Sequence, residues 1–408
     1  MNTNTFGEIL VKLRKKSGMT QQALAERLDC SNKTISKWEN SETQPEINVL
    51  PKLADIFGVS VDYLLLGERK SIAFAGNILV DAVKDIECYP ELGMLATITN
   101  VSQSVGGCVP NTGINLAKID PTIPISAYGC VGEDEKGNYV LNKMRQYNID
   151  VKGVTVLTDV DTSFSDDMNL PNGERTFFHY RGANARFSPE HIDLSQLKCH
   201  MLHLGYALLL DKFDEYDEEY GTVMARFLSK VQKKGIKTSI DIVSESSADW
   251  ENKIVPTLKY VDYFICNEIE CCSCFGLNPY TDDGRLSVKN IKRAMKMALD
   301  AGVGEKVIVH CKPAGFCMSK NGEFTCVTSL DVPRKYFKGS VGAGDAFCAG
   351  TLYGIYNDYS DKEILEFAAA AAVCNLFAAN GIDGMRNKKG ILELMATYGR
   401  SPMPEVEE

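Results

Sequence analysis

The feature that most constrains this chain is a regular alternation of short strand-like runs and helical stretches, which begins at Ser71. Such alternation predicts a doubly wound α/β fold, with a mostly parallel sheet and helices on both faces. The apolar runs that we assign to strands are 72–75, 125–128, 154–157, 201–204, 238–242, 263–266 and 307–310. The helical stretches between many of them are 111–119, 139–147, 220–233, 288–301 and 361–379.

One segment departs from this alternation. Residues 163–169 and 175–180 are short β-like runs on either side of the turn Pro171-Asn172-Gly173. An Asn-Gly turn between two such runs is a strong hairpin signal. We therefore expect a small inserted β lid on the α/β domain.

The first part of the chain contains short helical patterns only. Phe6, Ile9, Leu10 and Leu13 share one helical face. Thr20 and Ser31 are good N-caps for two helices, at 21–28 and 32–39, and further helices are expected at about 49–57 and 61–66. The predicted division is a small all-α domain at 1–67, a linker at 68–71, the α/β domain at 72–395 and a flexible tail at 396–408.

Bulk properties limit where the chain works. It has no run of 18 apolar residues, so no membrane span is expected, and no secretory signal pattern at its start, so a cytoplasmic location is expected. Residues 1–70 hold ten basic and nine acidic residues, a net charge of +1; the total of −10 then leaves −11 for the rest. A DNA-facing surface therefore belongs to the first part.

The fourteen cysteines have no regular spacing, which favours free thiols over a disulfide framework. The one cluster is Cys271, Cys272 and Cys274. It contains a single Cys-x-x-Cys pair, and a zinc or redox site requires more ligands.

Two predicted helices joined by Asp29-Cys30-Ser31 have the spacing of a helix-turn-helix. This segment resembles the Cro/phage-repressor (XRE) family of DNA-binding domains over about residues 5–67. Asp29-Cys30 stands where that family commonly has glycine and an aliphatic residue, and Asn40 stands where glycine is common. The likeness is carried by Thr20-Gln21-Gln22-Ala23-Leu24-Ala25, Thr34-Ile35-Ser36-Lys37-Trp38-Glu39, Pro45 and Val59-Ser60-Val61-Asp62-Tyr63-Leu64-Leu65.

The resemblance implies that the second helix of the pair enters the major groove of double-stranded DNA. The positions that match are Asn32, Lys33, Thr34, Ser36 and Lys37 for base edges, with Gln21, Gln22 and Lys37 at phosphates. The alternative is a solvated helix face that contacts another protein. Because such domains usually bind DNA in pairs, the resemblance also implies a homodimer.

The strongest chemical motif is Gly342-Ala343-Gly344-Asp345. Glycines let backbone N–H groups approach a phosphate, and a helix that begins there directs its positive end at that phosphate. Phosphoryl transfer also requires a base beside the attacking hydroxyl, and Asp345 stands where that base is required. The alternative is a glycine-rich turn in which Asp345 is only a helix cap.

Two further segments carry polar residues next to glycines. Gly106 and Gly107 precede Asn111, which is either a ligand for a polyol or the N-cap of a helix that begins there. Asp81 follows the first strand, where doubly wound folds bind ligands. It is either a ligand for sugar hydroxyls or a solvated loop carboxylate.

These segments, in this order, resemble the ribokinase-like (PfkB) carbohydrate kinase family over about residues 71–395. The likeness also includes Gly129-Cys130-Val131-Gly132-Glu133-Asp134 with Gly137, Asn267-Glu268-Ile269-Glu270, and Gly182-Ala183-Asn184 after Arg175-Thr176-Phe177-Phe178. The fold that it implies is a ribokinase-like domain with a lid that closes over the sugar.

The resemblance implies a role for each matching residue. Asp345 would be the general base, and Gly342, Ala343 and Gly344 would form the anion hole. ATP would be the phosphate donor, and Asn267 and Glu270 would organise Mg²⁺ through water. The residues implied at the sugar are Asp81, Gly106, Gly107, Asn111 and Asn184, and those implied at the nucleotide are Asn267, Glu270, Lys312, Gly315 and Asn375.

Three positions depart from the family pattern. Gly339 stands where an acidic residue usually helps to bind a monovalent cation, so dependence on potassium stays open. Lys312 replaces a usual glycine in the nucleotide region, and Asp241-Ile242-Val243-Ser244-Glu245 lacks the Asn and Arg often seen after that Asp.

Three functions are therefore compared. The first is an active sugar kinase coupled to DNA binding. The second is a transcription regulator whose kinase domain only senses a sugar. The third is a nucleoside kinase, in which Phe177, Phe178 and Tyr180 form a slot for the base, although they would serve equally as lid core.

Overall fold

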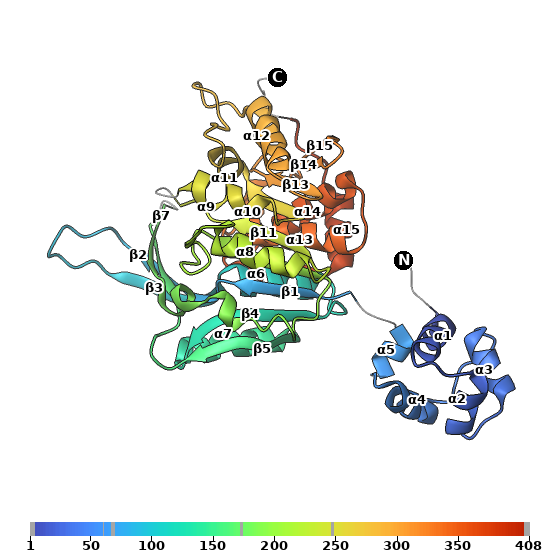
Figure 1. Ribbon diagram of the computed structural model, residues 1–408. Coiled ribbons are helices and arrows are strands. Elements are labelled where there is room, and N and C mark those ends of the chain that lie inside the picture. The colour runs from blue at the N-terminus through green and yellow to red at the C-terminus, as the bar shows by residue number, and fades with distance from the viewer. Residues whose placement is uncertain (1–4, 60, 67–69, 172–173, 246–248, 404–408) are drawn as a thin grey trace. The chain divides into compact units, whose positions relative to one another are not determined.

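The computed structural model describes residues 5–59, 61–66, 70–171, 174–245 and 249–403. The chain divides into two compact units, Met1–Lys70 and Ser71–Glu408 (Figure 1). Residues 68–69 of the expected linker, 172–173 of the expected hairpin turn and 404–408 of the expected tail lie outside the described residues. No helix of the described ranges is long and apolar enough to cross a membrane.

The first unit is all-helical, as predicted. The hydroxyl of Thr20 accepts a hydrogen bond from the amide of Ala23, and that of Ser31 from Thr34, so both are N-caps. Between those helices Asp29 has a φ of 54°, a left-handed conformation that an Asp side chain tolerates. The elements are α1 (Phe6–Lys16), α2 (Gln21–Arg27), α3 (Asn32–Glu39), the 3₁₀ turn η1 (Ile47–Val49), α4 (Leu50–Phe57) and α5 (Val61–Leu66). Fully buried leucines and an isoleucine form its core: Leu10, Leu24, Ile35, Leu53 and Leu64.

The second unit is built on a nine-stranded sheet in the order β15-β14-β13-β12-β11-β8-β1-β4-β5. Pairing is parallel from β5 to β13, and antiparallel at the β14–β15 edge. All seven predicted strands are present. The strands are β1 (Ile72–Gly76), β4 (Ile125–Gly132), β5 (Ile149–Leu157), β8 (Met201–Ala207), β11 (Lys237–Ile242), β12 (Tyr263–Asn267), β13 (Lys306–His310), β14 (Ala314–Ser319) and β15 (Phe324–Thr328).

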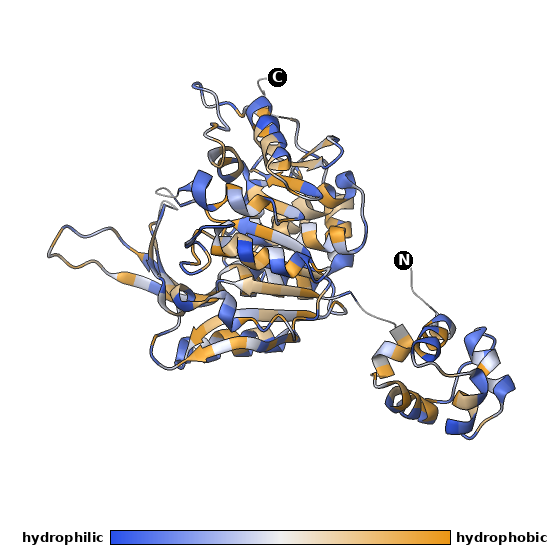
Figure 2. Ribbon diagram, viewed as in Figure 1, coloured by the Kyte–Doolittle hydropathy of each residue, from blue (hydrophilic) through white to orange (hydrophobic). Residues whose placement is uncertain are grey.

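Helices cover both faces because alternate strand residues point to opposite sides. In β1, Ile72 and Phe74 pack into one apolar core, whereas Ala73 and Ala75 pack into the other. Apolar residues of the flanking helices line both cores. Figure 2 shows orange, hydrophobic stretches on these helices. The helices are α6 (Cys108–Ile119), α7 (Glu135–Gln146), α8 (Val223–Gln232), α9 (Trp250–Lys253), α10 (Val255–Leu258), α11 (Glu268–Ser273), α12 (Val288–Asp300), α13 (Ala343–Tyr356), α14 (Asp361–Leu376) and α15 (Lys388–Thr397).

The lid is a separate four-stranded sheet in the order β3-β2-β6-β7. The predicted hairpin is present as β6 (Phe164–Asn169) and β7 (Arg175–Tyr180), which pair antiparallel. The other two strands, β2 (Leu79–Ile86) and β3 (Ile98–Gly106), were not predicted. Much of β3 is solvent-exposed, so its side chains carry no clear in–out alternation.

Short elements complete the second unit. They are the two-residue strands β9 (Tyr216–Asp217) and β10 (Gly221–Thr222) and the 3₁₀ turns η2 (Gly182–Arg186), η3 (Pro189–His191) and η4 (Arg334–Tyr336).

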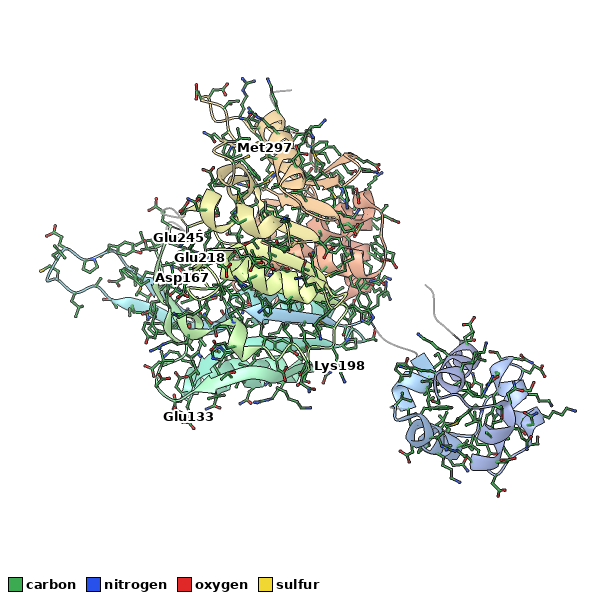
Figure 3. All side chains as sticks on the ribbon, viewed as in Figure 1. Glu133, Asp167, Lys198, Glu218, Glu245 and Met297 are labelled. Atoms are coloured by element: carbon green, nitrogen blue, oxygen red, sulfur yellow. The ribbon has the colours of Figure 1, made fainter. Side chains whose placement is uncertain are left out.

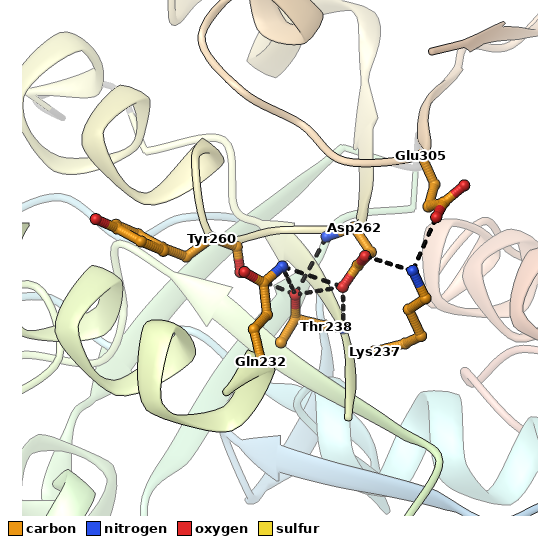
Figure 4. Close-up of polar contacts among 6 residues, drawn as sticks. All are labelled: Gln232, Lys237, Thr238, Tyr260, Asp262 and Glu305. Carbon is orange, nitrogen blue, oxygen red and sulfur yellow. Dashed lines mark hydrogen bonds and ion pairs between the residues drawn. The ribbon is translucent and has the colours of Figure 1, made fainter. Parts of the chain in front are cut away.

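A polar cluster around Asp262 lies at the amino-terminal ends of the central strands, and Asp262 itself immediately precedes β12 (Figure 4). Its carboxylate accepts hydrogen bonds from the Lys237 ammonium at 2.8 Å and the Thr238 amide at 2.9 Å. Gln232 Nε2 donates to it at 3.1 Å. The cluster joins α8, β11 and β12 at the end of the sheet opposite to the strand carboxyl ends, and its role is structural.

Candidate active site and recognition helix

The candidate active site lies beyond the carboxyl ends of the parallel strands, where doubly wound folds place their ligands. Asn77, directly after β1, ties three elements together there. Its Oδ1 accepts from the Tyr206 amide at 2.6 Å, its carbonyl from the Val109 amide at 3.2 Å, and its Nδ2 donates to Leu209 O at 3.2 Å. Asn77 was not predicted as a site residue, although it stands between the first strand and Asp81.

Asp345 is the centre of the site. It lies in the first turn of α13, is only 7% exposed and accepts hydrogen bonds from three side chains. Tyr206 OH donates to Oδ1 at 2.6 Å, Thr112 Oγ1 to Oδ1 at 3.3 Å, and Asn111 Nδ2 to Oδ2 at 3.0 Å. Two predicted site residues, Asn111 and Asp345, are therefore in direct contact across 234 positions of sequence.

Burial raises the pKa of Asp345 to about 7. The hydrogen bond from Tyr206 opposes that rise because it stabilises the charged form, and the nearby negative charge of Asp241 adds to it. A carboxylate with a pKa near neutrality is suited to take a proton from an alcohol during reaction.

The prediction for the start of α6 was wrong. The helix begins at Cys108 and not at Asn111, so Asn111 is not an N-cap. Gly107 occupies the cap position with a φ of 87°, which favours glycine. A Cβ on Gly107 would lie 2.5 Å from the carbonyl oxygen of Asn77, so only glycine allows this close approach. The earlier start places Asn111 inside the first turns, where its side chain reaches Asp345.

The start of α13 depends on glycine as well. Gly342 is its N-cap, with a φ of 70°, and a Cβ there would lie 2.5 Å from the Cα of Gly381. Asn375 Nδ2 donates to the carbonyls of Gly342 at 3.0 Å and Gly381 at 2.5 Å, and Asn375 is 1% exposed. The first amides of a helix have no partner within it, so Gly342 and Gly344 lie where backbone N–H groups can bind an anion. The Ala343 amide donates to Ser340 O at 3.3 Å, so it can join them only by sharing or releasing that bond.

The remaining residues expected at the sugar lie along the junction of lid and sheet. A Cβ on Gly106 would lie 2.4 Å from Asp81 Oδ2, so Gly106 and the Asp81 carboxylate are adjacent. Burial raises the pKa of Asp81 to about 7, with a further contribution from Asp167 of β6, labelled in Figure 3. Asn184 is fully buried, and its Oδ1 accepts from the Ile78 amide at 3.0 Å.

Asn267 and Glu270 form a capping box at the start of α11. Glu270 Oε2 accepts from the Asn267 amide, and Asn267 Oδ1 from the Glu270 amide, both at 2.8 Å. Ser244 Oγ donates to Glu270 Oε1 at 2.9 Å. Burial raises the pKa of Glu270 to about 8. Each carboxylate oxygen retains acceptor capacity, which suits contact with a hydrated cation through water.

The other two residues expected at the nucleotide lie after β13. The Lys312 carbonyl accepts from Ser329 Oγ at 2.8 Å, and a Cβ on Gly315 would lie 3.2 Å from the ring of Phe347 in α13. The same ring lies 5.0 Å from the ring of His310. Burial lowers the pKa of His310 to about 4, so this imidazole is neutral at physiological pH.

In the first unit, α3 presents Asn32, Lys33 and Lys37 to solvent, while Thr34 and Ser36 are half-buried. The side-chain amide of Gln21 already makes a hydrogen bond within the domain, because its Nε2 donates to Glu39 Oε2 at 2.7 Å. Gln22 Nε2 donates to Glu26 Oε1 at 3.0 Å.

Glu39 also pairs with Arg14, whose Nη2 donates to Oε2 at 2.9 Å. The Arg14–Glu39 pair therefore fixes α1 against α3.

Comparison with known proteins decides the family. A family model described as pfkB family carbohydrate kinase matches residues 70–388. The chain belongs to the pfkB family of carbohydrate kinases. This kinase is 22% identical to ribokinase of Arabidopsis thaliana over 326 residues, 79% of this chain and 80% of that protein. The structure of the Arabidopsis ribokinase complexed with ribose and ATP matches with a TM-score of 0.68 at 20% identity, covering 80% of this chain and 99% of that one.

A helix-turn-helix family model matches residues 10–64 of the kinase. The chain is 34% identical to the HTH-type transcriptional activator BcrR of Enterococcus faecalis over 127 residues. This stretch covers 30% of this chain and 61% of that protein. The predictions of a ribokinase-like α/β fold, a carbohydrate kinase and an XRE-type domain are confirmed.

Two groups that contact Asp345, Tyr206 and Thr112, were not predicted from the sequence. Thr112 directly follows the predicted site residue Asn111, so its position next to that motif was a signal that could have identified it. Tyr206 lies at the end of a strand in no recognised motif, and only the fold brings it to Asp345.

Proposed function

We propose that this kinase transfers the terminal phosphoryl group of ATP to a hydroxyl of a small sugar, with Asp345 as the general base. The observation that carries the proposal is the position of this carboxylate. It is buried in the first turn of a helix that begins at a left-handed glycine, and it contacts Asn111. A base beside a set of backbone amides is the arrangement that phosphoryl transfer requires.

In the proposed reaction the sugar lies between the lid and the strand ends, held by Asp81, Gly106, Gly107, Asn111 and Asn184. Asp345 takes the hydroxyl proton as the oxygen attacks phosphorus, and the amides of 342–344 stabilise the transferring group. Closure of the lid would exclude water and so suppress hydrolysis of ATP.

Lys312, Gly315 and Asn375 are assigned to the nucleotide side. The buried position of Asn375 favours a supporting role, in which it holds Gly342 in place.

Mg²⁺ would be held through water by Asn267 and Glu270. The fit is favourable because Mg²⁺ prefers oxygen ligands and keeps several of its waters. When bound with ATP, the cation neutralises phosphate charge. The residues of this chain that orient its water shell would be Glu270 and the Ser244 hydroxyl that fixes it.

The second candidate function is a sugar-sensing regulator without turnover. One observation favours it: both oxygens of Asp345 already accept protein hydrogen bonds, and Tyr206 OH lies at 2.6 Å from one of them. A substrate hydroxyl would have to share or displace these donors. The nucleoside alternative has its support in Phe177, Phe178 and Tyr180, which are 60%, 57% and 42% exposed on the lid.

One experiment separates the three functions. The full chain is assayed for ADP formation with ATP and Mg²⁺ on ribose, fructose, 2-keto-3-deoxygluconate and inosine, with melting-temperature shifts measured for the same compounds. Turnover of a sugar that is abolished by Asp345→Asn supports the kinase. Ligand-induced stabilisation without turnover supports the sensor, and turnover of inosine alone supports the nucleoside kinase.

We also propose that the first unit binds double-stranded DNA through α3, as a homodimer. The support is the exposed face of Asn32, Lys33 and Lys37, next to half-buried Thr34 and Ser36. Amide and ammonium groups on one helix face can reach base edges and phosphates.

A further inference from the structure

Three side chains capable of binding a metal converge near the Asp345 carboxylate. Cys108 is the first residue of α6, His203 lies in the middle of β8, and Asp241 lies in β11. All three are buried, and a ligand atom of each lies within 4.8 Å of the other two. No cluster of this kind was expected from the sequence, because the three residues are far apart in the chain.

The imidazole is already oriented for coordination. His203 Nδ1 lies 3.0 Å from Ser239 Oγ, which leaves Nε2 directed at the cluster. A hydrogen bond to the second nitrogen is the usual device that fixes a ligating histidine. Nε2 lies 3.5 Å from Asp241 Oδ1 and 3.6 Å from the sulfur of Cys348. Tetrahedral zinc places neighbouring N, O and S ligands about 3.3–3.6 Å apart, as its bond lengths require.

The carboxylate lacks the partner that a metal would supply. Asp241 Oδ1 is inaccessible to solvent, and within the described ranges it accepts no hydrogen bond of standard geometry. Its polar neighbours are His203 Nε2 at 3.5 Å and the Cys108 thiol, which are the other two members of the cluster. A buried polar atom without such a bond is costly.

The backbone beside the cluster makes room for these donor atoms. A Cβ on Gly205 would lie 1.6 Å from Asp241 Oδ1 and 2.9 Å from Cys108 Sγ. Only glycine at this position allows both atoms to converge.

We propose that Cys108, His203 and Asp241 form a binding site for a zinc-class divalent cation, with Cys348 as the nearest fourth donor. Thiolate, imidazole and carboxylate together suit zinc, whereas Mg²⁺ takes oxygen ligands, so the site is distinct from any magnesium bound with ATP. Binding displaces the thiol protons of Cys108 and of Cys348 to solvent.

The bound cation would join three elements that hold the active site. Cys108 follows Gly106 and Gly107, His203 shares β8 with Tyr206, and Cys348 lies one turn after Asp345 in α13. The site is closed and structural, and it does not depend on the proposed kinase reaction.

The test uses the full chain, freed of metal and kept in a non-thiol reductant. Zn²⁺ is titrated against a chromogenic chelator, and Co²⁺ is added separately to detect thiolate-to-cobalt charge-transfer absorption. We expect one equivalent of tightly bound Zn²⁺ and a charge-transfer band in the unaltered chain. Cys108→Ala should lose the band and bind Zn²⁺ at least about 10-fold more weakly.

Two further variants keep the test decisive. Asp241→Asn preserves shape and should also weaken Zn²⁺ binding at least about 10-fold. Cys274→Ala, which removes a buried thiol from the separate cluster at 271–274, should bind Zn²⁺ as the unaltered chain does. The proposal is overturned if the unaltered chain binds no Zn²⁺, if Cys274→Ala alone abolishes binding, or if folded Cys108→Ala and Asp241→Asn bind Zn²⁺ with unchanged affinity.

Discussion

Asp345 illustrates how burial and hydrogen bonding oppose each other at one carboxyl group. Burial disfavours its charge, and the bonds from Tyr206, Asn111 and Thr112 favour it. The resulting pKa of about 7 lets the group exchange a proton near neutrality. When the Asp345 carboxyl group is ionised, it lowers the free energy of unfolding.

The first prediction concerns the pH dependence of turnover. Because the base must be ionised, kcat/KM should rise with pH through about 7 and then level off. Tyr206→Phe removes a bond that stabilises the ionised form, so the rise should move to higher pH. The measurement is kcat/KM from pH 5.5 to 9 for both proteins. A shift to lower pH would contradict the assigned role of Tyr206.

The second prediction concerns stability. The pKa of Asp345 is raised from 3.8 to about 7 on folding, so the folded state loses stability relative to the unfolded state as pH rises from about 4 to about 7. Asp345→Asn removes this loss. The free energy of unfolding of Asp345→Asn minus that of the unaltered chain should therefore be about 2 kcal/mol larger at pH 8 than at pH 5. The measurement is urea unfolding at both pH values, and parallel changes in the two proteins would refute the raised pKa.

At the scale of elements, the strands of the central sheet were predictable because each is a short, continuous apolar run between turn residues. The strands β2 and β3 were not predictable, because the lid sheet is partly open to solvent and apolar residues such as Ile98 and Val101 are exposed on it. The start of α6 was predicted at Asn111, whereas the helix begins at Cys108, with Gly107 at the cap position and a positive φ of 87°.

The candidate site was predictable only where its residues stand in short motifs. Asp345, Asn111 and the glycines were found because each stands in its own short motif. Tyr206 and the cluster of Cys108, His203 and Asp241 were not found, since they come together only when separate strands align in the sheet. Contacts of this kind leave no signature in a single sequence.

The third prediction tests whether the amino-terminal ends of the strands, around Asp262, have a structural role, while their carboxyl ends hold the active site. In Asp262→Ala, Lys237 keeps Glu305 as an ion-pair partner, but the buried Thr238 amide and hydroxyl lose the Asp262 carboxylate. The second unit should therefore lose about 2 kcal/mol of stability. Turnover of the folded protein should stay within about twofold, because this edge is opposite to the strand ends that carry Asp345. The measurement is urea unfolding together with kcat.

Asp300→Ala is the matched control for this test. The Lys296–Asp300 pair is largely exposed, so its loss should cost less than about 0.5 kcal/mol. Equal destabilisation by the two changes would contradict the structural role of the Asp262 cluster.

At the scale of the whole molecule, one chain carries a carbohydrate kinase and a helix-turn-helix domain of different charge. The near-neutral first unit retains exposed lysines on α3, whereas the remainder is strongly acidic. An acidic surface repels nucleic acid, so DNA contacts are expected from the first unit alone.

The fourth prediction tests this assignment. Lys37→Ala should weaken binding of duplexes of unrelated sequence alike, by about 3- to 10-fold, and should reduce the slope of log K against log salt by about 1. Lys52→Ala, an exposed lysine on α4, should change neither. The measurement is fluorescence anisotropy over a series of salt concentrations. Equal effects of the two changes would locate DNA binding outside α3.

The central claim is that Asp345 is the base of a working kinase, and one comparison tests it most directly. Phosphorylated sugar and ADP are quantified for the unaltered chain and for Asp345→Asn, at saturating ATP and sugar, with sugar affinity measured in parallel. The account predicts that kcat falls at least about 10²-fold while the sugar still binds. Turnover by Asp345→Asn at the rate of the unaltered chain would contradict it.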